Sequence, residues 1–260
     1  MKSVPLALAL AAAGSSGCTP AATAAALEVS TPRPPAAWPS QPEWTEARAR
    51  LAALRVTAPG VPYTEVVNVT MRDPRSGRTL QARGAVAVAP HRALRMILLG
   101  PGGSTALDVW ATPDRWRLAV PPLGLLRRGA AEADPALPIG FFRWWFLAPL
   151  DGRLLDGRAT STSAFYVLRA DRTTVTVWSE GGTDGEGEAR LRLRAVRREG
   201  GQRIDRLAWS GRSLRPAAED RATYEQLRSG LLVEVGVESV SDGPPEDAAF
   251  EDPDGAQGRQ

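Results

Sequence analysis

From Tyr63 onward, hydrophobic and polar positions alternate with a period of two over short runs. The first run places Val67, Val69 and Met71 on one face, and later runs repeat the pattern as far as Val240. Each run is bounded by Pro, Gly or Asp, which is typical of half-buried antiparallel strands joined by turns. The sequence therefore predicts about ten or eleven strands in one sheet.

A helix is predicted immediately before these strands. Ser40, with Glu43 three residues later, has the pattern of a capping box at a helix start. The apolar residues that follow share one helical face: Trp44, Ala47, Leu51 and Leu54. This amphipathic helix is expected to pack against the sheet.

The alternation breaks between the two groups of strands, where Leu137–Leu147 can form a short helix. Five of the chain's sixteen aromatic residues fall within Phe141–Phe146. Because these side chains point in all directions, the segment must be buried on most sides or meet another apolar phase. Core packing, a lid over an apolar cavity and contact with lipid all remain open.

A sheet of so many twisted strands curls or closes on itself. We therefore expect a mainly β fold, a strongly curved, half-open antiparallel β-barrel of about ten or eleven strands with two or three helices at its mouth or in its interior. Alternation alone assigns the inward face, and a slip of one residue would reverse it. The side chains predicted to line an apolar cavity are Val67, Val69, Met71, Val86, Leu94, Met96, Leu98, Leu107, Val109, Trp116, Leu118, Phe142, Trp145, Phe146, Leu191, Leu193, Val233 and Val235.

The stretch LLGPGGSTALDVW, residues 98–110, allows two interpretations: a phosphate-binding loop or a hairpin turn. A Walker loop requires a lysine that reaches the phosphates, but Lys2 is the only lysine of the chain. The glycine spacing also differs from that of a dinucleotide fingerprint. The sequence therefore favours a hairpin between two strands.

Few residues are suited to catalysis or to metal binding. His91 and Cys18 are the only residues of their types, which excludes a His/Cys zinc site. No G-x-S-x-G motif is present, so a hydrolase acting through His91 is the least favoured reading. The acidic loop 181–190 lacks the ligand spacing of a calcium loop. We expect no catalytic residue, no metal and no cofactor, and a protein that is not an enzyme.

The charge distribution of the chain does not favour a nucleic-acid-binding protein. The formal net charge is only +3, and acidic and basic residues are interspersed without a basic block. No nucleic-acid partner is expected.

The first residues are typical of a secretory signal, because Lys2 is followed by a short apolar stretch and small residues up to Cys18. The start resembles a bacterial lipoprotein signal, in which Cys18 is acylated and begins the mature chain. The alternative is an ordinary signal peptide cut nearby, which would leave a free thiol. We expect a signal peptide at 1–17, a Pro/Ala-rich tether at 18–39, a folded domain at 40–255 and a disordered tail at 256–260. Thr19 in place of aspartate follows the sorting rule for the outer membrane.

The order of several motifs resembles the LolA/LolB superfamily, in particular the LolB-like outer-membrane lipoprotein receptors. The resemblance is carried by WTEARARLAAL before the first strand, GPGGSTALDV at the turn, LPIGFFRWWFLAPLDG at the aromatic helix and FEDPDG at 250–255. It implies a half-open barrel whose apolar interior holds the acyl chains of lipoproteins, with a periplasmic LolA-like carrier as a further partner. That family has an exposed apolar residue at a loop tip that engages the membrane. The corresponding loop here is Pro101, Gly102 and Gly103, with glycine at the tip.

Two functions follow from the sequence. The first is a lipid-anchored protein on the periplasmic face of the outer membrane that binds acyl chains of lipoproteins, or lipids, and supports lipoprotein localisation. The second is a structural or partner-binding lipoprotein with a filled core and no lipid ligand. The volume of the barrel interior distinguishes them.

Overall fold

The computed structural model describes residues 39–74, 77–130, 139–170, 172–183, 187–241, 243 and 245–255. The predicted signal peptide, the lipid attachment at Cys18, nearly all of the tether and the tail at 256–260 lie outside these residues. The predicted domain at 40–255 is therefore the part of the chain whose fold is described below.

The described residues form thirteen strands in a single sheet. In chain order they are β1 (Tyr63–Asp73), β2 (Arg78–Ala89), β3 (Ala93–Leu99), β4 (Thr105–Ala111), β5 (Arg115–Val120), β6 (Leu125–Ala130), β7 (Arg153–Ala159), β8 (Ser163–Ala170), β9 (Thr173–Thr183), β10 (Ala189–Glu199), β11 (Gln202–Gly211), β12 (Arg221–Gln226) and β13 (Leu231–Ser241).

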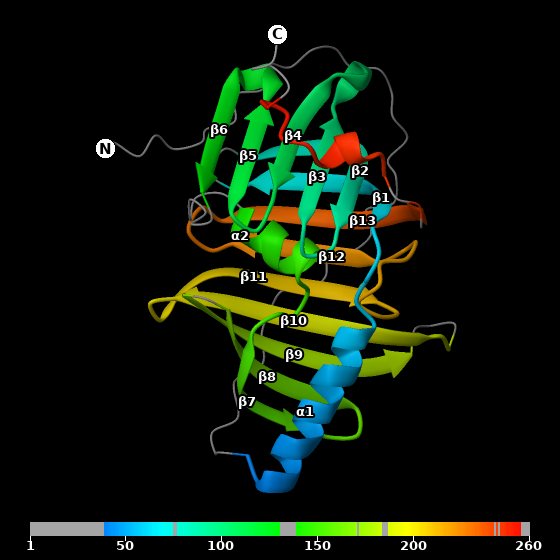
Figure 1. The fold of residues 1–260 in the computed structure, drawn as a ribbon, viewed down its shortest axis with the longest axis vertical. Coiled ribbons are helices and arrows are strands. Elements are labelled where there is room, and N and C mark those ends of the chain that lie inside the picture. Colours follow the sequence, from blue (N-terminus) through cyan, green and yellow to red (C-terminus); the bar gives the residue numbers. More distant parts are fainter. Residues whose placement is uncertain are drawn as a thin grey trace.

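The strands are arranged as two antiparallel meanders that meet at the β1–β13 pair. The order is β6-β5-β4-β3-β2-β1-β13-β12-β11-β10-β9-β8-β7, so β6 and β7 are the two free edges and the sheet is not closed. Strands at one end of the sheet run across the direction of those at the other end (Figure 1). The sheet is thus a curved, half-open barrel, as the sequence predicted at this level.

The predicted count of ten or eleven strands was too low by the two edge strands, β6 and β7. The turn residues around these two strands predict a break in the sheet instead. β6 pairs only with β5, and most of its side chains are exposed, Leu126 to 42%. An edge strand with little buried surface does not need alternating hydrophobic residues, so its sequence carries a weak signal.

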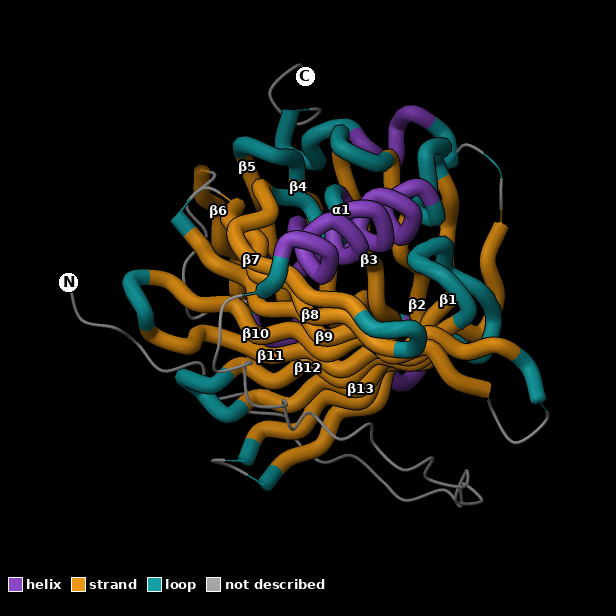
Figure 2. Tube along the Cα trace, turned by 90° about the horizontal axis from the view of Figure 1, so that it is seen from below, coloured by secondary structure: helices purple, strands orange, loops and turns teal. Residues whose placement is uncertain are grey.

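Helix α1 (Gln41–Val56) begins as predicted. The Ser40 side chain accepts from the Glu43 N–H at 3.5 Å, and the Ser40 N–H donates to Glu43 Oε2 at 2.7 Å, which completes the capping box. Ala47 and Leu51 are buried against the core. The helix packs on β7 and β8 inside the curve of the sheet (Figure 2).

The predicted helix 137–147 is shorter and less regular than expected. It consists of one α-helical turn, α2 (Ile139–Phe142), that continues as a π-helix, η3 (Arg143–Leu147). Residues 137 and 138 lie outside the described part. We refer to Ile139–Leu147 as the aromatic segment.

The glycine-rich stretch forms a hairpin turn, as predicted. A 3-10 turn, η1 (Pro101–Gly103), joins the paired strands β3 and β4. Gly102 and Gly103 have φ angles of 78° and 77°, a left-handed conformation that favours glycine. Two further 3-10 turns are η2 (Pro121–Leu123) and η4 (Asp247–Phe250).

Candidate functional site

The aromatic segment packs against the concave face of the sheet, which we call the hollow. Ile139, Trp144, Phe146 and Leu147 belong to the main hydrophobic core. The ring of Trp145 lies 5.7 Å from that of Trp209 on β11. Core packing, one of the three environments left open by the sequence, is therefore observed for these four side chains, while Phe142 and Trp145 border a cavity.

An inner cavity of about 60 Å³ remains between the segment and the sheet. Half of the predicted lining residues form its walls: Val67, Val69, Val86, Met96, Phe142, Trp145, Phe146, Val233 and Val235. They come from β1, β2, β3, β13 and the aromatic segment, which the fold brings together. That they contact a ligand stays a prediction.

The other predicted lining residues do not border this cavity. Six are buried in the same core: Leu94, Leu98, Val109, Trp116, Leu118 and Leu193. Three are partly buried against it: Met71, Leu107 and Leu191. Alternation identified the inward face of each strand, but it does not show which part of that face the helices cover.

The size of the inner cavity limits what can bind without rearrangement. Pockets for small molecules usually measure roughly 300–1,000 Å³. A cavity of about 60 Å³ holds only a few atoms. A long acyl chain fits in the hollow only if the aromatic segment moves outward.

Two buried carboxyl groups, Glu65 and Asp220, also line the inner cavity. Burial, and next the negative charge of Asp220, raise the pKa of Glu65 to about 8, against a hydrogen bond to Tyr63 that lowers it. Burial also raises the pKa of Asp220 to about 6, although it accepts from the Ala217 N–H at 2.9 Å and lies 3.7 Å from Arg190. Glu65 is not among the residues predicted from the sequence, yet its position in phase with the inward Val67 was a usable signal.

A second cluster of buried polar side chains lies beside α2, at the start of the aromatic segment. Arg197 forms an ion pair with Asp205 at 3.1 Å, and Asp205 is also hydrogen-bonded to Tyr224. Burial raises the pKa of Asp205 to about 6, and the nearby arginine opposes this shift. A Cβ on Gly140 would lie 2.9 Å from the Arg197 guanidinium, so a larger residue at this position requires the end of the Arg197 side chain to shift.

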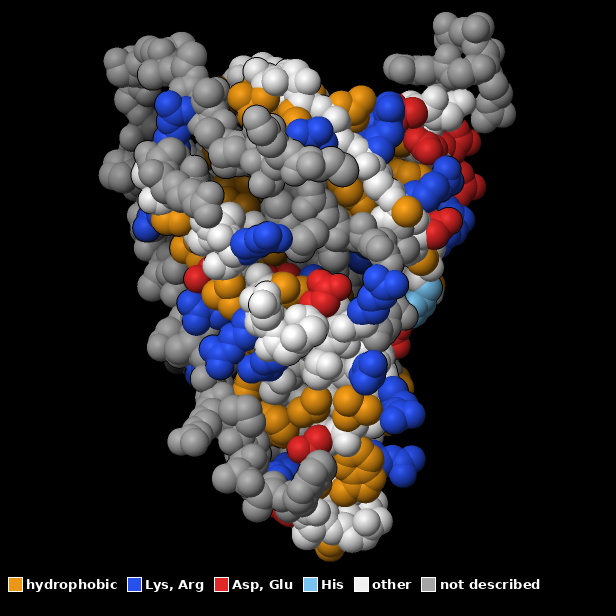
Figure 3. All heavy atoms as spheres, turned by 90° about the vertical axis from the view of Figure 1, so that its left-hand side faces the viewer, with side chains coloured by type: hydrophobic (Ala, Val, Ile, Leu, Met, Phe, Trp, Pro, Cys, Tyr) orange, Lys and Arg blue, Asp and Glu red, His pale blue; other side chains and the backbone are white. Residues whose placement is uncertain are grey.

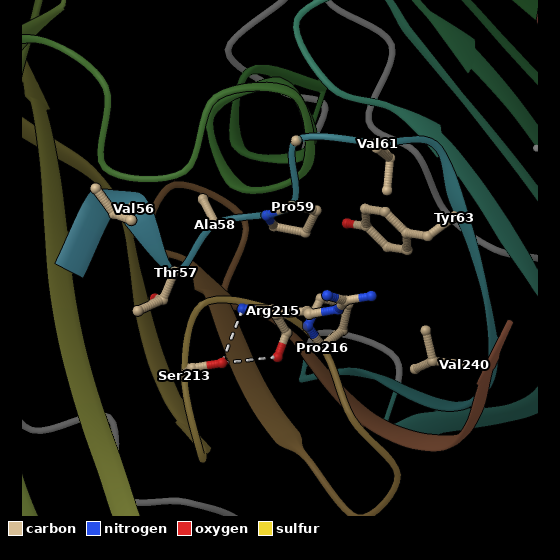
Figure 4. A pocket seen from close by; sticks show the side chains of 11 residues that line it. Val56, Thr57, Ala58, Pro59, Val61, Tyr63, Ser213, Arg215, Pro216 and Val240 are labelled. Carbon is tan, nitrogen blue, oxygen red and sulfur yellow. Dashed lines mark hydrogen bonds between the residues drawn. The ribbon is translucent and has the colours of Figure 1, made fainter. Parts of the chain in front are cut away.

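A larger, outer pocket of about 310 Å³ lies beside the C-terminal end of α1 (Figure 4). It is formed by the connection from α1 to β1 and by the loop between β11 and β12. Its walls are Val56, Thr57, Ala58, Pro59, Gly60, Val61, Tyr63, Ser213, Arg215, Pro216 and Val240. This pocket is not predictable from the sequence pattern, because loops that are distant in the sequence form it.

The predicted membrane or partner loop, Pro101, Gly102 and Gly103, is exposed at a hairpin tip. It borders neither the inner cavity nor the outer pocket. The role of the loop stays a prediction.

Basic and acidic side chains are distributed together over the described part of one face of the molecule (Figure 3).

The described residues contain no group of three or more His, Cys, Asp or Glu residues placed to hold a metal ion. Within this same part of the chain, no helix combines the length and apolar character needed to cross a membrane.

Comparison with known proteins gives similarity at the level of structure only. No family model matches the sequence, and no curated protein matches it. A LolA superfamily protein from Nitrosomonas europaea is similar, with a TM-score of 0.47 and 12% identity over 79% of this chain and 97% of the other. A DUF1329 family protein from Desulfovibrio piger has a TM-score of 0.46 and 11% identity over 80% and 97%.

A third similar structure is a domain named for outer membrane lipoprotein sorting, from Vibrio parahaemolyticus. Its TM-score is 0.41 and its identity is 10%, over 79% of this chain and 96% of the other. All three TM-scores are below 0.5, so the function must be argued from the geometry of the site.

Proposed function

We propose that this chain is a lipid-anchored protein on the periplasmic face of the outer membrane of a Gram-negative bacterium. It binds acyl chains of lipoproteins, or lipids, in the hollow of its curved sheet and supports lipoprotein localisation. The anchor would be Cys18, and a periplasmic LolA-like carrier would be a partner. The proposed role is binding and transfer without catalysis.

One observation supports this proposal above the others: the inner cavity has predominantly apolar walls, formed by the sheet on one side and the aromatic segment on the other. Val67, Val69 and Val235 line the sheet side, and Phe142 and Trp145 line the other. A bound acyl chain gains about 0.8 kcal/mol for each methylene removed from water. A chain of several methylenes therefore compensates for the aromatic contacts that it displaces.

The backbone of the aromatic segment is suited to such a displacement. One α-helical turn followed by a five-residue π-helix has few internal hydrogen bonds, and so short a helix is marginal by itself. The indole N–H of Trp144 is buried without a hydrogen-bond partner among the described residues, which lowers the cost of moving it.

The small volume of the inner cavity favours a second candidate, a structural or partner-binding lipoprotein with a filled core. In that case the aromatic segment is a permanent part of the core, and the concave face has no ligand. Native mass spectrometry of the full chain carrying Cys18→Ser, which removes the proposed anchor, separates the two when the protein is purified from the host envelope without detergent. Co-purifying lipid or lipopeptide is expected for acyl binding, and a repeatedly empty protein would favour the filled core.

Photo-crosslinking locates the bound chain. A fatty acid with a photoreactive diazirine in its chain is expected to label peptides containing Val67, Val69 or the aromatic segment. The internal control is Phe165, which pairs with Trp178 away from the main core. Labelling confined to the Phe165 peptide would contradict binding in the hollow.

A further inference from the structure

The convex face of the sheet, the side away from α1 and the aromatic segment, carries a buried hydrophobic cluster where β8, β9 and β10 lie side by side. Phe165, Trp178 and Val196 form this cluster, and their exposed fractions are only 7%, 8% and 1%. The residues that alternate with them, such as Tyr166 and Val177, belong to the main core on the concave face. We refer to the three residues as the convex aromatic cluster.

Burial at this cluster is a local property of the convex face. The rings of Phe165 and Trp178 lie 5.6 Å apart and are tilted by 60°, and Thr176 beside them is 4% exposed. The outward positions of β3, on the same face of the sheet, are far more open: Ile97 is 37% exposed and Leu99 is 42% exposed. Something therefore covers the sheet at β8–β10 that does not cover it at β3.

The described helices pack on other surfaces. Helix α1 packs on β7 and β8 from inside the curve, the aromatic segment contacts β2 and β3, and η4 contacts β3. Side chains on one face of neighbouring strands stand side by side and leave their outer ends open. The few side chains of the cluster do not bury one another, so a further segment of the chain is needed over them.

The N-terminal segment is the part of the chain best placed to supply this cover. It joins α1, which packs on β7 and β8 beside the cluster and starts at the β7 edge of the sheet (Figure 1). Residues 131–138 instead join β6 to α2, and residues 256–260 follow η4, which contacts β3. The other internal parts outside the described residues are at most three residues long.

The residues before α1 have a composition that suits an aromatic surface. The stretch STPRPPAAWP, residues 30–39, contains four prolines and one tryptophan: Pro32, Pro34, Pro35, Pro39 and Trp38. Prolines fix φ near −65° and favour an extended polyproline II conformation, which loses little entropy on binding. Aromatic-lined surfaces are the usual binding sites for such segments.

The segment is long enough to cover the cluster. From Ser40 back to Thr31, an extended polyproline II chain spans about 28 Å, at about 3.1 Å per residue. Neighbouring strands are about 4.8 Å apart, so the distance across the sheet from β7 to β10 is about 15 Å. Residues 31–39 can therefore pass around the β7 edge and still reach β10.

We propose that residues 32–38 of this chain dock on the convex aromatic cluster and cover Phe165 and Trp178. This inference goes beyond the proposed function, because it does not depend on what occupies the hollow. Docking would leave residues 19–31 as the spacer to an anchor at Cys18. The β8–β10 surface would then be held on the side of the molecule that faces the anchor.

Hydroxyl-radical footprinting read by mass spectrometry tests the cover. The full chain carrying Cys18→Ser is compared with a variant of equal length in which Pro32, Pro34, Pro35 and Trp38 are replaced by serine. Oxidation of Trp178 and Phe165 is expected to increase several-fold in the variant, because their outer surface is uncovered. Trp209, in the main core, should keep its wild-type oxidation and so reports that the fold is intact.

The matched control carries Ala24→Ser and Ala25→Ser, which change the same N-terminal segment outside its proline-rich stretch. Oxidation of Trp178 should remain at the wild-type level in this control. Unchanged oxidation of Trp178 in the four-serine variant would overturn the proposal. Equal increases at Trp178 and Trp209 would show a general loosening of the fold and would also contradict it.

A nitroxide label tests the same docking without changing the prolines. Cys18 is the only cysteine of the chain, so Ser30→Cys in the Cys18→Ser background gives a single labelling site. The label is expected to broaden the amide resonances of Val167 and Trp178, to leave those of Ile97 and Leu99 sharp, and to lose its effect in the four-serine variant. Broadening that survives the four serines would overturn docking through the proline-rich stretch.

A mixed sample distinguishes the chain's own segment from that of a second copy. Isotope-labelled protein without nitroxide is combined with nitroxide-carrying protein without isotope. No broadening at Val167 or Trp178 is expected in this sample. Broadening there would show that a second copy covers the cluster and would overturn the assignment to the chain's own segment.

Discussion

Glu65 is a single polar residue that makes the stability of the protein depend on pH. It is 5% exposed, and its pKa is raised to about 8, first by burial and then by the charge of Asp220. Below this pH the folded chain keeps a proton that the unfolded chain releases above about 4.5, so stability falls as pH rises through 8. Through this group the wild type is expected to lose about 1 kcal/mol between pH 7 and pH 9.

Urea unfolding at pH 7 and pH 9 measures this loss of stability. Both pH values lie above the range in which Asp205 and Asp220 titrate. In Glu65→Gln the difference between the two pH values should shrink by about 1 kcal/mol. Glu234→Gln, on the opposite face of the sheet, should keep the wild-type difference. An unchanged difference in Glu65→Gln would show that Glu65 ionises normally in the folded protein.

Gly84 is required by the close approach of β2 and β3. A Cβ at this position would lie 2.0 Å from the carbonyl oxygen of Ile97 and 2.8 Å from the Cα of Leu98. Both are backbone atoms, so the strands must separate to admit an alanine. Gly84→Ala is expected to lower the free energy of unfolding by about 1–3 kcal/mol.

The matched control for this substitution is Gly236→Ala on β13, where a Cβ meets no heavy atom within 4 Å. It should change stability by less than about 0.5 kcal/mol. Chemical denaturation of both variants provides the comparison. Equal effects would mean that flexibility of glycine, rather than space between the strands, controls stability at these positions.

At the scale of elements, α1 is the part whose start the sequence defined best. Ser40→Ala removes the acceptor for the Glu43 N–H and is expected to cost about 1 kcal/mol of stability. Arg48→Ala, at an exposed position of the same helix, is the control and should be near neutral. Thermal unfolding of the two variants checks this prediction, and equal melting temperatures would contradict it.

The edge strands show where hydrophobic periodicity fails. A central strand such as β10 packs Leu191, Leu193 and Ala195 against the core and has arginines at the positions between them, so its sequence alternates strictly. β6 and β7 each have one neighbouring strand, and their exposed positions tolerate residues of any polarity. Their pairing is set by the hairpins that connect them to β5 and β8, which tertiary contacts stabilise.

At the scale of the whole molecule, the residues that follow β13 pack on the strands at the β6 end of the sheet. Phe250 is buried against Ala89 and Ala93, and its carbonyl accepts from the Trp110 indole N–H at 2.9 Å. Asp254 adds an ion pair with Arg128 at 2.6 Å. The segment therefore links the chain end to strands β2, β3, β4 and β6.

Phe250→Ala is expected to lower the free energy of unfolding by about 2 kcal/mol, because it exposes apolar surface of the ring and of its neighbours. In hydrogen exchange through local opening, the amides of Ala93 and Trp110 should lose protection. The amides of β8 and β9 should keep their wild-type protection. Equal loss of protection across the sheet, or none, would contradict a role for Phe250 in holding this end of the sheet.

The sequence by itself determined the antiparallel sheet, its inward face, the start of α1 and the hairpin at Gly102 and Gly103. These features depend on neighbours in the chain: a period of two, a capping box and a positive φ angle. Only the tertiary structure decided that the aromatic segment packs against the hollow and that Val67 and Val233 border the remaining space while Leu193 does not. It alone joined Val61 and Arg215 in one pocket, because packing between distant segments sets which surfaces meet, and periodicity carries no information on that.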